Sequence, residues 1–352
     1  MATNESSINK VKNSICEYIS PVENMQHYAL REGFVFIKGF RDRIFDEIVV
    51  RSPSDSNCYT PIVPKTDKTI DDYIDLINGA ELDHALVFAK DLSFLTKCPT
   101  LKFISIYPSD DLDGEMNFAP LYCTKNIKSL CVKMTYGEYP NVKMVRNEID
   151  YSRIEGLVCL HISFDSSCHK YYNKVDTLKT LSISQYPQKD LKELFGSEIL
   201  DSLFIITSRI VSLDGISQSH FMQSVYLCYN RSLKDINALA DVKSTLRVLK
   251  IENCPRISDF SVLQELKNLE VLILKGKNKL PSLRFISELK KLKILIFDME
   301  IEDGDLIPCL SVPYASCEKP KKYYNLKSAD LPHDSVDLKN TGVENVEFWR
   351  RV

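Results

Sequence analysis

Cysteine and histidine residues lie close together in one part of the sequence, where they could supply a nucleophile and its general base. Cys159 and His161 are separated by one residue, and Cys131 precedes them in a stretch of similar pattern. An imidazole beside a thiol can accept its proton and create the thiolate that cysteine enzymes use. No acidic residue evidently placed to orient the histidine, and no glycine loop for an oxyanion, stands nearby. A chance pairing is therefore favoured over catalysis by Cys159 or His161.

Metal and phosphate chemistry have weaker candidates still. Cys159 and His161, together with Cys168 and His169, lack the paired ligand spacing of zinc sites. The lysines within residues 319–322 form a short basic cluster, which is typical of a solvated surface. The sequence has no G-x-x-x-x-G-K-[ST], G-x-G-x-x-G, H-E-x-x-H or G-x-S-x-G motif. We predict no metal, no cofactor and no enzymatic activity.

The composition indicates a folded, soluble protein with no affinity for polyanions. Of the 352 residues, 44% are apolar and 26% are charged, and the formal net charge is -3. This balance disfavours nucleic acid as a partner. The first residues are polar and resemble no secretory signal, and no apolar stretch approaches the roughly 20 residues that cross a bilayer. The odd number of cysteines, 11, is typical of reduced thiols. We expect a cytoplasmic protein that does not bind membranes.

A repeated aliphatic triplet organises most of the chain. Leu246, Leu249 and Ile251 have the spacing L-x-x-L-x-L, and the same spacing returns 23 residues later from Leu269. Ten copies begin 19 to 30 residues apart, and their first residues are Leu82, Leu101, Ile127, Leu157, Leu178, Leu200, Met222, Leu246, Leu269 and Leu292. Because strand side chains alternate between faces, positions four and six of each copy should point into a shared core. One repeat cannot bury these residues alone, so the pattern predicts a stacked parallel sheet.

Position nine of each copy is expected to carry a polar side chain that bonds to the turn. Ser109, Thr135, Asp165, Ser208 and Asn230 fit this expectation. Four further copies depart from it with Tyr186, Cys254, Lys277 and Glu300. A regular asparagine ladder along the whole array is therefore not predicted.

The segment ISDFSVLQELKNLEVLILKG, residues 257–276, resembles the leucine-rich repeats of about 22 residues found in bacterial proteins, including internalin-like ones. The resemblance covers roughly residues 82–300. It implies an α/β solenoid, a curved leucine-rich repeat array with a parallel concave sheet and about ten repeats. It also implies protein binding through the concave side. Unlike surface-exposed members, this sequence shows no secretion signal and no wall-anchoring tail, which favours an intracellular protein.

Three regions follow from these patterns. Residues 1–80 should form an N-terminal cap of short helices with a possible hairpin between 34–37 and 44–50 and a helix over 71–77. An adaptor role for this region is the alternative. Residues 81–307 should form the repeat array, and residues 308–352 a C-terminal cap or tail, because their aromatic residues make a free tail unfavourable.

Positions three, five and seven of each copy should line the concave side. From them we predict a partner-binding surface of Phe103, Tyr107, Lys133, His161, Ser182, Ser184, Phe204, Ile206, Tyr226, Lys250, Glu252, Ile273 and Ile296. Small polar residues in the middle would admit a partner's side chains, and rigid aromatics would anchor it. An apolar run at Val248, Val271, Ile273, Ile294 and Ile296 is unusual on a solvated face. A partner could cover it, the C-terminal tail could fold over it, or the register could be shifted.

The function that the sequence favours is a non-catalytic, monomeric module that binds another protein on its concave side. An inhibitor or immunity-type protein that neutralises its partner is one form of this function. That form depends on analogy at the level of the fold. An adaptor or scaffold is the second hypothesis, and a Cys/His enzyme is the third.

Overall fold

The computed structural model describes residues 17–18, 28–37, 47–51, 66–89, 91–106, 116–132, 148–164 and 169–336. The chain divides into two compact units, an N-terminal unit of residues 1–175 and a C-terminal unit of residues 176–352. In the described residues, no helix is long and apolar enough to cross a membrane.

The N-terminal unit begins with four strands that alternate in direction. They are β1 (Glu17–Tyr18), β2 (Tyr28–Arg31), β3 (Phe34–Ile37) and β4 (Glu47–Arg51), and each is antiparallel to the next. Strand β4 then pairs in parallel with β5 (His84–Phe88), the first strand of the repeat pattern. The predicted pairing of 34–37 with the following strand is confirmed. The short helices expected near the start of the chain lie mostly outside the described residues, which place strand β1 at Glu17–Tyr18.

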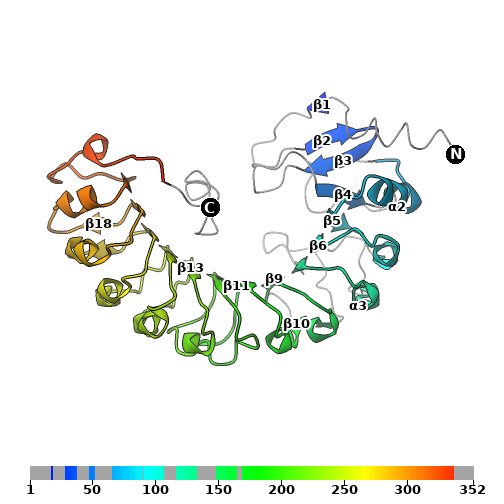
Figure 1. Ribbon diagram of the computed structural model, residues 1–352, viewed down its shortest axis with the longest axis horizontal. Helices are drawn as coiled ribbons and strands as arrows, with labels where there is room; N and C mark the ends of the chain where they lie inside the picture. Colours follow the sequence, from blue (N-terminus) through cyan, green and yellow to red (C-terminus); the bar gives the residue numbers. More distant parts are fainter. Residues whose placement is uncertain are drawn as a thin grey trace. The chain divides into compact units, whose positions relative to one another are not determined.

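Helix α2 (Ile70–Gly79) confirms the helix predicted over 71–77. Its start is fixed by a capping box, in which the Thr69 backbone N–H donates to the Asp72 carboxylate (2.7 Å) and the Asp72 N–H donates to Thr69 Oγ1 (3.3 Å). The helix buries Tyr73, Leu76 and Ile77. Because these three residues recur at helical spacing, one face of α2 covers the first repeats, as Figure 1 shows beside β4 and β5.

Short parallel strands and helical turns alternate in the rest of the N-terminal unit. The parallel strands after β5 are β6 (Phe103–Ile106), β7 (Ser129–Val132) and β9 (Cys159–Ser163). Between them lie η1 (Ser93–Lys97), α3 (Ala119–Cys123) and η2 (Tyr151–Arg153), followed by η3 (Tyr172–Lys174). A small parallel pair, β8 (Ile149–Asp150) with β10 (His169–Lys170), lies apart from the main sheet.

The C-terminal unit contains the most regular part of the array. Its main strands pair in parallel in the order β11 (Thr180–Ser184), β12 (Ser202–Ile206), β13 (Ser224–Cys228), β14 (Val248–Glu252), β15 (Val271–Lys275), β17 (Ile294–Phe297) and β19 (Tyr314–Cys317). The connecting 3-10 helices are η4 (Ile216–Gln218), η5 (Asn237–Val242), η6 (Ser261–Glu265), η7 (Arg284–Glu288) and η8 (Ile307–Ser311). Strands β16 (Lys279–Leu280) and β18 (Glu300–Ile301) pair in parallel and form a separate two-stranded sheet.

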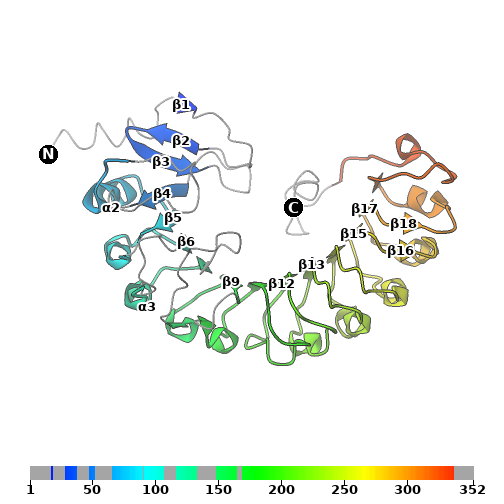
Figure 2. The ribbon, with the colours of Figure 1, turned by 180° about the vertical axis from the view of Figure 1, so that it is seen from behind.

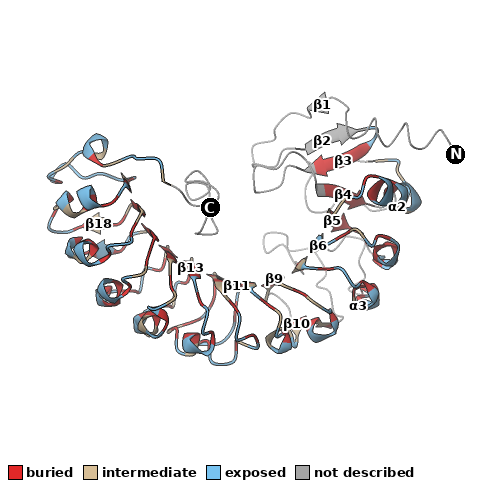
Figure 3. Cartoon of the chain, viewed as in Figure 1, coloured by how far each residue is buried: buried red, intermediate tan, exposed pale blue. Residues whose placement is uncertain are grey.

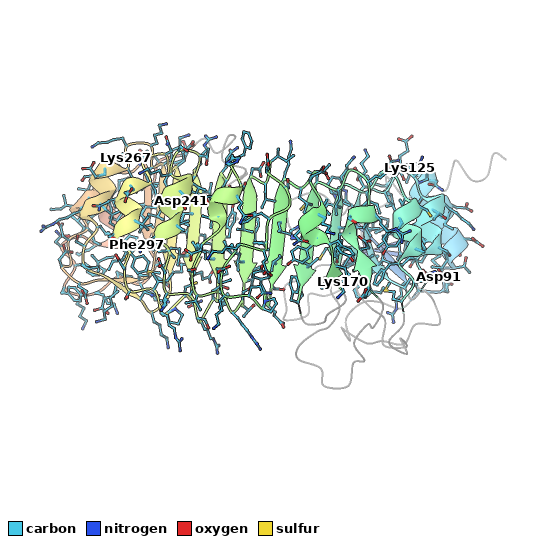
Figure 4. All side chains as sticks on the ribbon, turned by 90° about the horizontal axis from the view of Figure 1, so that it is seen from below. Asp91, Lys125, Lys170, Asp241, Lys267 and Phe297 are labelled. Atoms are coloured by element: carbon cyan, nitrogen blue, oxygen red, sulfur yellow. The ribbon has the colours of Figure 1, made fainter. Side chains whose placement is uncertain are left out.

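Strands and 3-10 helices occupy opposite sides of this unit. The strands lie on its inner, concave side and the helices on its outer side, and Figure 2 shows the same order from behind. Charged side chains such as Asp241 and Lys267 lie on the helix side in Figure 4. Buried residues gather on the strands and exposed ones on the helices (Figure 3). The predicted fold class, a leucine-rich repeat solenoid, is confirmed by this alternation.

The core forms where the triplets predicted it. Each fourth and sixth position of the repeats in the C-terminal unit is buried, as are Leu246 and Leu269 at the first position. Leu249, Ile251, Leu272 and Leu274 are examples with no exposed surface. Burial of each such side chain stabilises the fold by about 1.5–3 kcal/mol before the loss of entropy is counted.

The turns that follow β11, β12, β13 and β14 share one backbone geometry. Gln185, Thr207, Tyr229 and Asn253 all adopt a left-handed backbone with φ between 49° and 59°. Their backbone N–H groups donate to the last carbonyl of the next strand, as from Thr207 to Cys228 at 2.9 Å. Each turn is thereby fastened to its neighbour in the stack.

Two of the polar residues expected at position nine form a short buried ladder. Asn230 accepts a bond from the Ser208 backbone N–H (2.8 Å) and donates to the Ile205 carbonyl (2.8 Å). Ser208 Oγ in turn accepts from the Tyr186 backbone N–H (3.0 Å). The other fitting positions, Ser109, Thr135 and Asp165, lie outside the described residues.

The strand pattern continues beyond residue 307, where we expected the array to end. Helix η8 and strand β19 complete another turn, with Ala315 and Cys317 as buried inward residues. The chain then returns beside β19: Ala315 N–H donates to the Pro332 carbonyl (2.9 Å), and Asp334 N–H donates to the Pro313 carbonyl (3.0 Å). An antiparallel bridge joins Tyr314 to His333. The edge strand is therefore partly covered, which limits pairing with other chains.

Candidate functional site

The strand register of the C-terminal unit places equivalent concave-side residues in straight rows. The middle row consists of Ser182, Phe204, Tyr226, Lys250, Ile273, Ile296 and Ser316, each paired with the next across neighbouring strands. Six of these seven residues belong to the surface predicted from the sequence. A one-residue shift would have put Leu272 in this row, so the possibility of a shifted register is removed.

An aromatic pair marks the centre of this row. The rings of Phe204 and Tyr226 lie parallel, with their centroids 3.9 Å apart and an interplanar angle of 1°. Parallel strands are about 4.8 Å apart, so equivalent aromatic residues on adjacent strands are placed to stack. Tyr226 is only 6% exposed, whereas Phe204 is half-buried. One face of the Phe204 ring is therefore covered by Tyr226, and the side chain as a whole stays partly accessible.

The concave side of β11 and β12 carries small, half-buried polar side chains. Thr180, Ser182 and Ser184 come from β11, and Ser202 comes from β12. Ser202 donates a hydrogen bond to Asp201 (2.8 Å) at the edge of the sheet. Ile206, also predicted, is half-buried at the far end of β12. Because these side chains are short, the concave side next to Phe204 is accessible.

From β13 to β19 the concave side is buried and apolar. Its cluster consists of Tyr226, Val248, Val271, Ile273, Ile294, Ile296 and Tyr314, with Phe204 and Val336 packed against it. Ile273 and Ile296 have no exposed surface, and neither does Lys250. The structure therefore corrects our expectation that these three residues, together with Tyr226, form an accessible surface.

Lys250 is a buried cation between Tyr226 and Ile273 in the middle row. Its ammonium nitrogen lies 2.8 Å from a carboxylate oxygen of Glu252, whose side chain is 13% exposed. Removing both charges from water costs free energy that offsets much of their mutual attraction, so the pair adds little net stability. Beside it, burial raises the pKa of the Cys228 thiol to about 11, which keeps the thiol protonated and unreactive at neutral pH.

The rim of the buried part carries ion pairs that sequence reasoning missed. Lys275 lies 3.2 Å from Glu318, and Lys319 pairs with Asp298, which also accepts the Gly276 N–H at 2.6 Å. The partners are 21 to 43 residues apart in sequence, and only the stacking of repeats brings them together. The expected basic cluster at 319–322 is thus partly neutralised.

The predicted residues of the N-terminal unit form a separate group. Phe103 is 36% exposed and stacks on His84, with ring centroids 4.2 Å apart. His84 Nδ1 lies 2.6 Å from the Asp83 carboxylate. Tyr107 and Lys133, also predicted, lie outside the described residues.

The Cys159–His161 pair suggested by the sequence is in contact. The sulfur lies 3.1 Å from His161 Nε2, and both residues are half-buried on β9. This contact would allow proton transfer from the thiol to the ring. In the described residues, no group of three or more His, Cys, Asp or Glu side chains could hold a metal ion.

His169 has a structural environment. Its Nδ1 lies 2.7 Å from the Tyr151 hydroxyl, and its Nε2 lies 2.7 Å from the Ser163 carbonyl. Burial lowers the pKa of His169 to about 4, so the ring is neutral at physiological pH. Cys168, its sequence neighbour, lies outside the described residues.

Comparison with known proteins gives structural similarity without sequence similarity. No protein-family model and no curated protein matches the sequence. An internalin, InlF, from Listeria monocytogenes is 14% identical, with a TM-score of 0.48, and the match covers 83% of this chain and 87% of that one. The functional domain of InlJ from the same organism is also 14% identical, with a TM-score of 0.41 over 67% of this chain and 58% of that one. A leucine-rich repeat protein of Leptospira interrogans is 16% identical, with a TM-score of 0.36 over 65% of this chain and 53% of that one.

Proposed function

We propose that this protein is a non-catalytic module that binds another protein on the concave side of β11, β12 and β13. The observation that carries the proposal is the stacked pair of Phe204 and Tyr226 beside the small polar side chains of Ser182 and Ser202. A few anchor residues, aromatic ones prominent among them, supply most of the binding energy in protein interfaces.

The geometry suits a protein partner in two further ways. The short side chains of β11 leave room for a partner's larger side chains, and their hydroxyl groups can donate and accept hydrogen bonds. Tyr226 holds Phe204 in place before binding, which reduces the entropy lost on association. The net charge of -3 offers no general attraction for nucleic acid phosphates.

The more specific form of the proposal is an inhibitor or immunity-type protein that acts on one intracellular partner. A surface built on strands, with its turns fastened to their neighbours by hydrogen bonds, changes little on binding. Such preorganisation suits a tight, neutralising complex better than an adaptable contact with many partners.

The proposal is tested by blocking the surface with one large side chain. Ser182→Arg places a long cation on the middle row, whereas Ser244→Arg makes the same change at an exposed turn after η5. Tagged chains are used to capture proteins from the lysate of the native source, with quantitative mass spectrometry as the readout. We expect a protein captured by the wild type and by Ser244→Arg but lost with Ser182→Arg. Equal capture by all three chains would refute binding at this surface.

A further inference from the structure

Strand β9 of the N-terminal unit holds a thiol and an imidazole in contact on the side that faces away from the repeat core. Leu160 and Ile162 are buried in that core. Cys159 and His161 alternate with them and point to the other side, where both are half-buried. The Cys159 sulfur lies 3.1 Å from His161 Nε2. The thiol proton therefore has an acceptor beside it when the imidazole carries its own proton on Nδ1.

The neighbouring strand β7 places only short side chains beside this pair. Ser129 lies next to Cys159, and Cys131 lies next to His161. Both residues of β7 are themselves half-buried. A hydroxymethyl group and a second thiol are too short to cover the Cys159 sulfur, so this strand leaves it open to a small reagent.

Four other thiols of the chain are kept protonated by their surroundings. Burial raises the pKa of Cys98 and Cys228 to about 11. Burial also raises the pKa of Cys254 and Cys309 to about 12. Because the thiolate is the nucleophile, these four residues are unreactive near neutral pH. Cys123 is exposed at the end of α3 and provides an accessible reference thiol.

We propose that Cys159 is a histidine-activated thiol that is modified by small disulfides to form a mixed disulfide. His161 takes the thiol proton, and the resulting thiolate attacks one sulfur of the incoming disulfide. The bond between the two incoming sulfurs breaks as the bond to Cys159 forms. The departing thiolate then takes the proton from His161. The Cys159 sulfur is thereby oxidised and the departing sulfur is reduced, and the disulfide itself is the only other reactant.

Cys131 is too far away to displace the added group by forming an internal disulfide. It is paired with His161, so it lies diagonally across the two strands from Cys159. With strands about 4.8 Å apart and a rise of about 3.3 Å per residue, the two Cα atoms are about 8 Å apart, beyond the roughly 7 Å that a disulfide spans. The adduct should therefore persist until an external thiol removes it. The modification does not depend on the proposed function, because it concerns only the chemistry of β9.

Reaction of the reduced full-length chain with oxidised glutathione at pH 6 tests the proposal, with the adduct at each cysteine followed over time by peptide mass spectrometry. At this pH an ordinary thiol, with a pKa near 8.5, is less than about 1% ionised. His161→Gln leaves an amide that cannot take up the proton. We expect it to slow the reaction at Cys159 at least about fivefold, because a lost thiolate fraction is only partly offset by stronger nucleophilicity. The rate at Cys123 should not change. His84→Gln is the matched control at another half-buried histidine of the same sheet, and it should leave both rates unchanged.

Two results would overturn the proposal. One is a wild-type rate at Cys159 in a His161→Gln chain that circular dichroism shows to be folded, and the other is faster modification of Cys131 than of Cys159. Should His161→Gln fail to fold, the wild-type chain is compared at pH 6 and pH 8. An ordinary thiol reacts about 75-fold faster at pH 8, in proportion to its thiolate fraction, whereas we expect a rise of less than about tenfold at Cys159. A rise as steep as that of an ordinary thiol would contradict activation by His161.

Discussion

Lys250 and Glu252 form an ion pair of 2.8 Å on one strand, and the Lys250 side chain has no exposed surface. Residues two apart on a strand point to the same side, so the pair follows from the local sequence alone. Its burial does not, because that depends on what lies over the concave side. The local sequence therefore sets the contact between Lys250 and Glu252, and the packing over the concave side sets its burial.

Removing one member of this pair should be more harmful than removing both. Glu252→Gln leaves Lys250 buried without a counter-ion, and we expect a loss of about 3–5 kcal/mol in the free energy of unfolding. The double variant Lys250→Met with Glu252→Gln should recover most of this loss. Urea unfolding at neutral pH measures both values. A single variant as stable as the wild type would show that Lys250 reaches water.

The short ladder at Asn230 should contribute measurably to stability. Asn230 is fully buried, and Asn230→Ala removes its bonds to Ser208 N–H and the Ile205 carbonyl. An unsatisfied buried group costs about 1–3 kcal/mol, so we expect a loss of at least that size. Asn237→Ala, at an exposed residue of η5, is the control and should change stability by less than about 0.5 kcal/mol. Equal effects of the two substitutions in thermal unfolding would exclude a special role for the ladder.

His169 should make the protein less stable in mild acid. Its pKa is about 4 in the folded chain, against an ordinary value of 6.5. Because the unfolded chain takes up the proton first, the stability contribution is fully present above pH 6.5 and is lost as the pH falls toward 4. Between pH 7 and pH 5 this residue should account for about 2 kcal/mol. His169→Gln should reduce the difference between unfolding free energies at the two pH values by that amount, and an unchanged difference would contradict the burial.

Cys159 should be dispensable for binding. It contacts His161 on β9, in the N-terminal unit, whereas the proposed surface lies on β11 to β13. We expect Cys159→Ser to capture the same partner as the wild type in equal amount. The same variant tests the enzyme hypothesis, because loss of any turnover shown by the wild type would make the thiol catalytic.

Much of the fold could be predicted because the repeat fixes it locally. The triplets around Leu203, Leu249 and Leu272 predicted strands, register and core, since alternation along a strand leaves one choice of buried face. The strand at 314–317 was harder to find, because Ala315 and Cys317 are smaller than the usual leucine and isoleucine. Their spacing from Val312 still follows the same triplet, and that spacing was the available signal.

The candidate site was predictable in position but not in exposure. Ser182, Phe204 and Tyr226 lie in one row as expected. The burial of Lys250 and Ile273 could not be predicted, because repeat spacing sets which side a residue faces and not how closely that side is packed. Phe204 therefore remains the accessible aromatic residue of the row, and binding should depend on it.

The most direct test of the binding surface is titration of the captured protein into wild-type and Phe204→Ala chains, with isothermal calorimetry as the readout. Loss of an aromatic anchor costs about 2 kcal/mol or more, so we expect Kd to rise at least about 30-fold at a temperature where circular dichroism shows both chains folded. The control Phe221→Ala removes a ring that is 54% exposed outside the strands and should leave Kd unchanged. An unchanged Kd for Phe204→Ala would contradict the central claim that the partner binds the concave side of β11 to β13.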